Sequence, residues 1–432
     1  MISLKPDLYQ QFRCPYCTEE LCKVEKIIFQ GLHILASTVC GTCKNNFLMD
    51  FPIGNARLYP TIIDKQKNAL VGRDKYYRWF HKSLLKAYNS PSDATVNIKK
   101  IIKNKCEKVI ILNCTDVLYG HVLLKLFNAT QYLERYPEEG LIIILPKSFA
   151  WLVPEGVAEI WLIDLKLSEF NNWYIALENL IEESLSHYQE VYFSLAYPIP
   201  SLENFSITPY SKVSPFSLVN FYRLPLQVSF IWREDRFWTG SGFEELLFLA
   251  FKKFSLLENF TIFRAFFCYF QALRLKKLTK KIKTEFPQVQ IKVIGLGRTG
   301  SFSKAIQDLR EDHISFEKEK EWCEQYAKSQ VVVGIHGSNM LLPTAHAAGF
   351  VEIIPHDRLG NWLQDIALPF TKRMDSFLGR LLPAYSKPKL VAKHVINILS
   401  NYEKFYVRNA PELHFYEKVD NVNERFKSGL RD

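Results

Sequence analysis

The sequence predicts an α/β protein with two Rossmann-like domains that face each other and a small zinc ribbon at the N-terminus. Three observations lead to this prediction. The chain has 432 residues, more than one hydrophobic core usually supports, so two or three domains are expected. Strand-like and helix-like segments alternate from residue 108 to residue 354, which favours parallel sheets covered on both faces. Two Cys-x-x-Cys pairs occur near the N-terminus.

The two cysteine pairs have the pattern of a structural zinc site, expected within residues 1–60. Cys14-Pro-Tyr-Cys17 and Cys40-Gly-Thr-Cys43 are separated by 22 residues. Tetrahedral zinc needs four ligands, and each pair supplies two thiolates at a suitable separation. Four thiolates leave no open coordination position, so we expect no catalytic role for this zinc. Four unrelated core cysteines are the alternative, and Cys22 is a spare thiol in either case.

The first α/β domain is expected over residues 106–225, after a polar connector at 61–105. Its strands are predicted where apolar residues run together, and its helices where apolar residues recur every three or four positions. Five prolines between residues 198 and 225 interrupt this pattern, as an interdomain linker does. The predicted strands are Val109–Asn113, Leu141–Leu145, Val157–Leu162 and Glu190–Leu195, and the predicted helices are Gly120–Arg135 and Asn171–Ser186.

The second α/β domain is expected over residues 226–405, followed by a tail at 406–432. Ligands of such domains bind beyond the carboxyl ends of the strands. One domain would therefore bind a nucleotide and the other a second substrate. The predicted strands are Leu226–Trp232, Val289–Ile294, Val331–Gly334 and Phe350–Ile354, and the predicted helices are Phe243–Lys283 with one break, Phe302–Arg310, Glu319–Lys328 and Asn339–Ala348.

The composition and charge fit a folded protein with anionic partners. Apolar residues make up 48% of the chain, and the net charge of +10 favours nucleic acid, an acidic membrane or a phosphate-bearing small molecule. No signal region and no long uncharged apolar stretch is present, so we expect a cytoplasmic protein, at most peripheral to the inner face of a membrane. An odd total of nine cysteines fits a reducing compartment.

The turn after Val331–Gly334 is a candidate phosphate-binding site. A strand that ends in a glycine turn and opens into a helix places free backbone N–H groups and the positive end of the helix dipole together. The residues of this turn are His336, Gly337, Ser338 and Asn339. His336 is expected to donate to a diphosphate, and Glu352, at the end of the next strand, to reach a ribose hydroxyl. An ordinary turn with an internally bonded histidine is the alternative.

Three segments, which occur along the chain in the family's order, resemble the family sixty-one glycosyltransferases. They are Gly334-Ile-His336-Gly337 with Val351-Glu-Ile-Ile-Pro355, then Val228-Ser-Phe-Ile-Trp-Arg233-Glu-Asp-Arg236, and Asp116-Val-Leu-Tyr-Gly-His121. The resemblance implies a GT-B fold, a nucleotide-sugar donor bound by the C-terminal half, and inverting transfer of a hexosyl or pentosyl group without an obligatory metal. We therefore expect a role in glycan or polysaccharide biosynthesis, with a glycan or a lipid-linked molecule as the acceptor. Ser338, Asn339 and Leu342 depart from the family pattern.

The residue chemistry is compatible with this interpretation. A departing nucleoside diphosphate needs cations or oriented donors, and Arg233 and Arg236 have forked donors suited to phosphate oxygens. A solvated charge cluster is the alternative for these arginines. The acceptor hydroxyl needs a base, for which His121 and Asp116 are the candidates, although both residue types are often structural at such positions.

Two other segments leave alternative functions open. Gly295-Leu-Gly297-Arg-Thr-Gly300, with Glu317 or Glu319 further on, has the pattern of a dinucleotide-binding loop and would indicate a nicotinamide enzyme. The basic run Arg274–Lys283 would suit an anionic membrane or a nucleic acid, the latter together with the zinc ribbon. A surface helix with a buried apolar face is the simpler interpretation of this run. No nucleic acid is expected if the protein is a glycosyltransferase.

Overall fold

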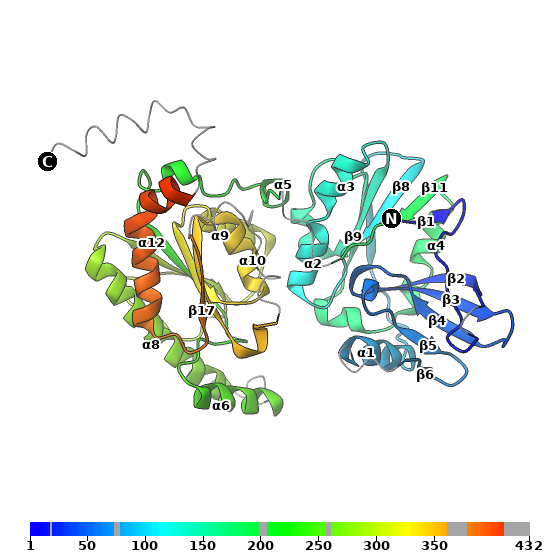
Figure 1. Ribbon diagram of the computed structural model, residues 1–432, viewed down its shortest axis with the longest axis horizontal. Coiled ribbons are helices and arrows are strands. Elements are labelled where there is room, and N and C mark those ends of the chain that lie inside the picture. Colours follow the sequence, from blue (N-terminus) through cyan, green and yellow to red (C-terminus); the bar gives the residue numbers. More distant parts are fainter. Residues whose placement is uncertain are drawn as a thin grey trace. The chain divides into compact units, whose positions relative to one another are not determined.

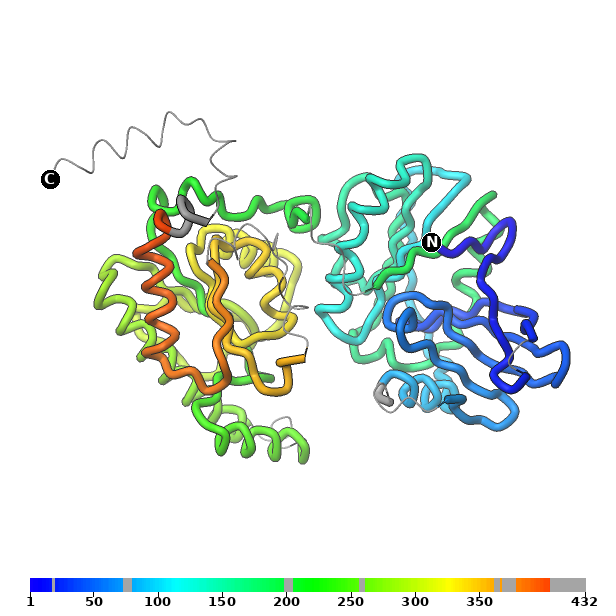
Figure 2. Tube along the Cα trace, viewed as in Figure 1, coloured from blue at the N-terminus to red at the C-terminus, as the bar shows by residue number. Residues whose placement is uncertain are grey.

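The computed structural model describes residues 1–17, 20–72, 78–197, 205–255, 261–360, 366 and 378–409 (Figure 1, Figure 2). The chain forms two compact units, Met1–Ser201 and Leu202–Asp432. Each unit contains a six-stranded sheet whose central strands are parallel. The predicted class, α/β with two Rossmann-like domains and an N-terminal four-cysteine region, is therefore confirmed.

The main sheet of unit 1 has the strand order β1-β11-β8-β9-β10-β7. Its four inner strands are parallel, and β1 and β7 run antiparallel at the edges. Every residue of β9 is buried, as expected for a strand covered on both faces. The strands are β1 (Ile2–Lys5), β7 (Ile98–Ile102), β8 (Lys108–Asn113), β9 (Gly140–Pro146), β10 (Glu159–Ile163) and β11 (Glu190–Phe193); the helices are α2 (Tyr119–Leu126), α3 (Ala129–Arg135), α4 (Leu180–Leu185), η2 (Lys147–Leu152), η3 (Leu167–Asn171) and η4 (Ile175–Leu177).

A second, antiparallel sheet of unit 1 carries the cysteine pairs. It consists of β2 (Cys22–Gln30), β3 (His33–Cys40), β4 (Asn46–Asp50), β5 (Ile62–Asp64) and β6 (Ala69–Leu70), with η1 (Gly54–Arg57) and α1 (Arg78–Tyr88) beside it. Its core residues Leu35 and Leu48 pack with Leu84 of α1 and with Trp173, which lies between η3 and η4. The small sheet therefore shares its core with the rest of unit 1.

The expected boundaries at residues 60 and 105 do not coincide with boundaries in the structure. Strand β1 pairs with β11 of the main sheet, and β5 and β6 extend the small sheet beyond residue 60. Strand β7 lies in the expected connector but pairs with β10. Long-range strand pairing, which local sequence patterns do not report, thus joins these segments into one unit.

The sheet of unit 2 is entirely parallel, in the order β14-β13-β12-β15-β16-β17. The strands are β12 (Gln227–Trp232), β13 (Gln290–Leu296), β14 (Gln307–Glu311), β15 (Val331–Ile335), β16 (Gly349–Ile354) and β17 (Gly379–Pro383). The helices are α5 (Thr208–Ser211), α6 (Gly242–Lys253), α8 (Thr261–Glu285), α9 (Phe316–Tyr326), α10 (Leu341–His346), α12 (Pro388–Asn409), η5 (Leu218–Asn220), η6 (Ser338–Met340) and η7 (His356–Arg358).

The helices of unit 2 cover both faces of its sheet. Helices α8 and α12 lie side by side over one face, where their apolar residues join the core with Phe230 and Trp232 of β12 (Figure 1). On the other face, Met340 lies close to Gly334 and Ile231. Both faces of β12 are therefore buried, and ligands can reach this strand only at its ends.

The predicted helix Asn171–Ser186 is helical only at the end of η3 and in η4 and α4. The predicted helix Phe302–Arg310 is wrong, because residues 307–311 form the edge strand β14. The reason lies in tertiary contacts. Arg310 is 1% exposed, and its guanidinium lies 4.8 Å from the ring centroid of Trp232 and 4.7 Å from that of Phe302. Its Nη1 and Nη2 donate to the carbonyl oxygens of Thr299 and Gly300. These contacts override the helical spacing of the segment.

Among the described residues, no helix has both the length and the apolar content needed to span a membrane.

Candidate functional site

Two arginines converge beyond the carboxyl end of β12. The Nη1 group of Arg233 donates to Asn339 Oδ1 at 2.6 Å, and that of Arg236 to the carbonyl oxygen of His336 at 3.2 Å. A Cβ atom on Gly337, whose φ is +152°, would lie 2.7 Å from Arg233 Nη1 and 3.3 Å from Arg236 Nη1. Glycine is therefore needed at position 337 for both guanidinium groups to approach the backbone.

The charge at this place is positive. Burial, as the largest cause, together with Arg233 and Arg358, lowers the pKa of Arg236 to about 10. Arg358 follows β16. Asp235 pairs with Arg233 at 2.5 Å and Asp357 with Arg236 at 3.3 Å, but both carboxylates are largely exposed. The arginine side chains are only 14% and 12% exposed. Three guanidinium groups thus face two solvent-screened carboxylates, which favours an anionic ligand.

His336 and Glu352 do not face solvent as the sequence had led us to expect. Both side chains are 0% exposed, and His336 Nδ1 lies 2.5 Å from Glu352 Oε2. Glu352 lies on β16, where it is the register partner of Gly334, and His336 directly follows the neighbouring strand β15. The alternative interpretation, a histidine bonded inside the protein, agrees with this geometry.

The helix expected to start at Asn339 is short. Residues 338–340 form a single 3₁₀ turn, and α10 contains only six residues, Leu341–His346. Such a short segment has little macrodipole, so the helix dipole that we expected to favour a phosphate is weak here. Asn339 instead accepts a hydrogen bond from Arg233, and Ser338 is half-buried at the start of the turn.

The glycine loop after β13 is filled by the protein itself. Glu234 accepts hydrogen bonds from the backbone N–H of Thr299 at 2.8 Å and from its hydroxyl at 2.7 Å. A Cβ on Gly297 would lie 2.2 Å from Glu234 Cδ. The loop also leads into strand β14 rather than into a helix. The dinucleotide-binding interpretation of Gly295–Gly300 is therefore wrong, since an internal carboxylate occupies the place of a phosphate.

In unit 1, Asp116 and His121 lie together at the carboxyl end of β8. Asp116 is fully buried, and its Oδ2 accepts from Lys125 Nζ at 2.8 Å, while His121 Nδ1 lies 3.3 Å from Oδ1. Burial raises the pKa of Asp116, but Lys125 and His121 outweigh this effect and hold the pKa well below its ordinary value. His121 is 17% exposed at its side chain, so of these two residues only the histidine reaches solvent.

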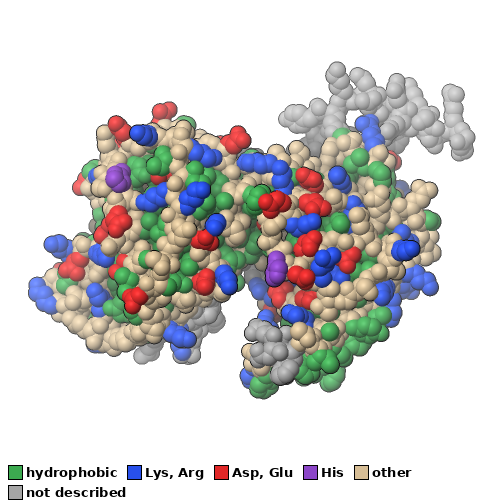
Figure 3. Space-filling view, turned by 180° about the vertical axis from the view of Figure 1, so that it is seen from behind, with side chains coloured by type: hydrophobic (Ala, Val, Ile, Leu, Met, Phe, Trp, Pro, Cys, Tyr) green, Lys and Arg blue, Asp and Glu red, His purple; other side chains and the backbone are tan. Residues whose placement is uncertain are grey.

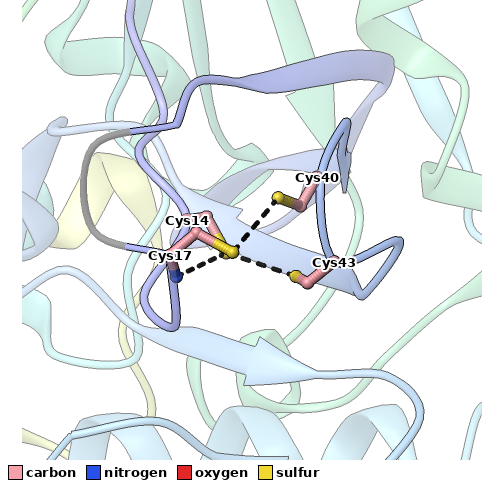
Figure 4. Close-up of side chains that lie close together, drawn as sticks. All are labelled: Cys14, Cys17, Cys40 and Cys43. Atoms are coloured by element: carbon pink, nitrogen blue, oxygen red, sulfur yellow. Dashed lines mark hydrogen bonds between the residues drawn. The ribbon is translucent and has the colours of Figure 1, made fainter.

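The four cysteines lie together and can hold a metal ion (Figure 4). All four sulfur atoms lie within 4.8 Å of one another, with 3.6 Å between Cys14 and Cys43 and 4.0 Å between Cys17 and Cys40. Zinc–sulfur bonds of about 2.3 Å give a tetrahedron with edges of about 3.8 Å, which these distances fit. Within the cluster the backbone N–H of Asn45 lowers the pKa of Cys43 to about 6, whereas the hydrogen bond with Cys43 raises that of Cys17 to about 12.

The sequence missed several residues of these sites. Arg358 and Asp357 contribute to the environment of the two arginines, Glu234 fills the glycine loop after β13, and Lys125 neutralises Asp116. Arg358 follows the end of β16 by four residues, so the rule that located Arg233 could have located it too. Glu234 and Lys125 carried no local signal, because their partners are distant in sequence or buried.

Comparisons with known proteins give distant structural similarities. Heptosyltransferase II of E. coli, described as an ADP-heptose lipopolysaccharide enzyme, has 11% identity and a TM-score of 0.35 over 68% of this chain and 99% of its own. E. coli heptosyltransferase WaaC with ADP has 13% identity and a TM-score of 0.35 over the same shares. The iron-containing dodecameric glycosyltransferase TibC of enterotoxigenic E. coli has 8% identity and a TM-score of 0.27, over 82% and 79%.

No protein-family model and no curated protein sequence matches the chain. At TM-scores this low, the structural similarities do not assign a function to it.

Proposed function

We propose that the protein is a GT-B glycosyltransferase related to family sixty-one, which moves a hexosyl or pentosyl group from a nucleotide-sugar donor to an acceptor hydroxyl. The observation that carries this proposal is the pair of largely buried guanidinium groups over Gly337, at the carboxyl end of a parallel sheet. Ligands of open α/β sheets bind at such ends. A nucleoside diphosphate is an anion of suitable size and charge for three converging arginines.

In the proposed reaction, Arg233 and Arg236 bind the diphosphate of the donor. As the bond from the anomeric carbon to the diphosphate breaks, negative charge grows on the leaving oxygen, and fixed cations stabilise it. Arginine can donate two parallel hydrogen bonds to a phosphate, so these residues supply the charge without a metal ion. Inversion at the anomeric carbon is the outcome that the family resemblance implies.

His121 of unit 1 is our candidate for the base that accepts the proton of the acceptor hydroxyl. Asp116 faces its Nδ1 atom, which leaves Nε2 for the substrate, as a carboxylate does for a catalytic histidine. Asp116 itself is buried, paired with Lys125 and a weak base, so its proposed role changes from base to positioning residue. We propose a glycan or lipid-linked molecule as the acceptor.

The donor site is tested by measuring the binding of UDP, GDP, CDP and ADP by calorimetry. We expect one of them to bind, and Arg236→Ala to weaken its binding by roughly 10- to 100-fold, the effect of removing a hydrogen-bond donor from a charged group. Arg298→Ala is the matched control, because Arg298 belongs to the same unit but is 56% exposed and pairs only weakly with Glu311 at 3.6 Å. Equal affinity of the two variants, or no binding by the parent, would refute the proposal.

Zinc is our proposal for the ion of the four-cysteine cluster, with a structural role. The metal content of the purified chain should be close to one zinc per molecule and should be lost in Cys40→Ser. Cys22→Ser is the matched control, since Cys22 is a neighbouring buried thiol outside the cluster. Retention of zinc by Cys40→Ser, or its loss from both variants alike, contradicts the assignment.

A further inference from the structure

Helices α6 and α8 of unit 2 expose an unusual number of large apolar side chains. The exposed fractions reach 77% for Phe243, 72% for Ile262 and 65% for Leu246. Figure 3 shows hydrophobic side chains gathered at the lower right, where these helices lie. Exposed apolar patches of this kind usually mark a contact surface. In the described part of residues 242–285, the large apolar side chains that are exposed are Phe243, Leu246, Leu249, Phe254, Ile262, Phe266 and Tyr269.

These side chains are not needed for the packing of the two helices. The inner faces of α6 and α8 already pack through aromatic rings, with 5.6 Å between the centroids of Phe248 and Phe267 and 4.7 Å between those of Phe251 and Phe263. Phe248 and Phe267 also belong to the main core of the unit. The outer apolar residues are therefore additional to a complete internal contact.

The exposed face of α8 changes from apolar to basic along the helix. Its residues at positions 262, 266, 269, 273, 276 and 280 are spaced by three or four and so share one face. The first four are Ile, Phe, Tyr and Leu, and the last two are lysines. From position 262 to position 280 this stripe extends about 27 Å at 1.5 Å per residue.

Further lysines widen the basic end. A groove of about 590 Å³ next to α8 is lined by Lys277, Lys280, Lys281, Lys387 and Lys389, together with Arg274. It continues along α12, where Lys393 lines it. Leu275, Leu278 and Ile282 of the same basic run are buried in the core. The basic run therefore exposes its lysines but buries its leucines. The exposed apolar surface next to these lysines comes from α6 and the first half of α8.

We propose that this surface, the outer face of α6 and α8 with the lysines of the α8–α12 groove, docks the protein on an anionic lipid bilayer. Aromatic and aliphatic side chains would enter the interfacial region, and the lysines would contact the headgroup phosphates. Membrane-surface binding of this type depends on both terms, apolar area and attraction to anionic lipids. The inference does not depend on the proposed donor site.

Two other partners fit the surface less well. A nucleic acid would use the lysines but would leave the aliphatic Leu246, Leu249 and Ile262 without a role. A second copy of the chain would cover the apolar side chains but would leave the lysines of the groove without an anionic partner. The acidic residues at the start of α6 do not compensate for this charge, because Glu244 pairs with Arg274 and Glu245 with Tyr385.

The test is co-sedimentation of the full chain with vesicles of phosphatidylcholine alone and with an equal mixture of phosphatidylcholine and phosphatidylglycerol. We expect binding to the mixed vesicles, weakened by salt, and little binding to phosphatidylcholine alone. Leu246→Asp with Ile262→Asp should abolish binding, with Leu58→Asp and Ile175→Asp as the control for two exposed apolar residues elsewhere. Lys277→Glu with Lys280→Glu should weaken it by more than about tenfold, against Lys103→Glu with Lys105→Glu as the charge-matched control.

Circular dichroism checks that each variant is folded. We expect all of them to fold, because every substituted side chain is exposed. Absence of binding to the anionic vesicles overturns the proposal, as does equal binding by the parent and both surface variants. Tight binding to RNA or DNA that needs the lysines but not Leu246 and Ile262 would identify a nucleic-acid surface instead. A dimer in solution that Leu246→Asp with Ile262→Asp dissociates would identify an interface between copies of the chain.

Discussion

The two glycine turns of unit 2 differ in the charge that approaches them. One turn follows β13 and the other follows β15, the two strands that flank β12. Consecutive residues after β12 enter the two turns: Glu234 binds the turn at Gly297, and Arg233 lies against Gly337. The first turn is therefore occupied by an internal anion, whereas the second is bordered by internal cations. A glycine indicates that some group approaches the backbone closely, but the charge of that group decides whether the turn is structural or can bind a ligand.

The largest effect is expected at the first turn. Gly297→Ala should destabilise the protein by about 3 kcal/mol, because its φ of +95° disfavours alanine and the new Cβ would overlap Glu234, which two hydrogen bonds to Thr299 hold in place. Thermal unfolding of unit 2 should then shift by about 6 to 12 °C.

Gly300→Ala is the matched control for this loss. Gly300 has a φ of +78°, but nothing lies within 4 Å of its added Cβ, so only the backbone effect of about 1–2 kcal/mol remains. If the two alanine variants lost the same stability, the contact with Glu234 would not be the cause.

A smaller and different effect is expected at the second turn. Gly337→Ala should push the guanidinium of Arg233 aside, since the added Cβ would lie 2.7 Å from Nη1, the far end of a flexible side chain. We expect nucleoside diphosphate binding to weaken about tenfold, as one charge-assisted hydrogen bond is misplaced. Calorimetry on folded Gly297→Ala should give the affinity of the parent. A similar loss of affinity in both glycine variants would remove the distinction between the turns.

The sequence predicted the inner strands of the two six-stranded sheets better than their edge strands or the partners of its motifs. Runs such as Leu141–Leu145 and Val331–Gly334 are apolar because parallel strands are buried on both faces, so composition alone locates them. The sequence also placed Arg233 and Arg236 after a strand, and the structure brings them together with Gly337 and Asn339.

The failures concern side chains whose partners lie on another strand or turn. His336 and Glu352 follow the predicted pattern but bond to each other across two strands, and no local spacing reveals that choice. The glycines at 295, 297 and 300 satisfy a dinucleotide pattern, yet Glu234, more than sixty residues earlier, fills the loop. Arg310 turns an expected helix into a strand through contacts with Trp232 and the turn itself.

The smallest effect concerns the pH dependence of the first turn. Asp308 accepts two hydrogen bonds of 2.9 Å from Arg310, the residue whose guanidinium holds the carbonyls of Thr299 and Gly300. Burial raises the pKa of Asp308, but Arg310 outweighs it, so the pKa lies below its ordinary value. A carboxylate with a lowered pKa contributes stability that is complete above the ordinary value of about 3.9 and is lost as the pH falls through the folded-state value.

Asp308→Asn should therefore unfold at a lower temperature than the parent at neutral pH. The loss in free energy of unfolding should be less than about 1 kcal/mol, because the side chain is partly exposed. The difference in Tm should shrink as the pH is lowered below the ordinary carboxyl value of about 3.9, because the parent then begins to lose this contribution. Asp312→Asn removes the same charge from the neighbouring exposed residue and is the control. A difference that stays constant over this pH range would mean that the Asp308 charge does not support Arg310, and that the contacts of Arg310 and Glu234 with the first turn are independent of this carboxylate.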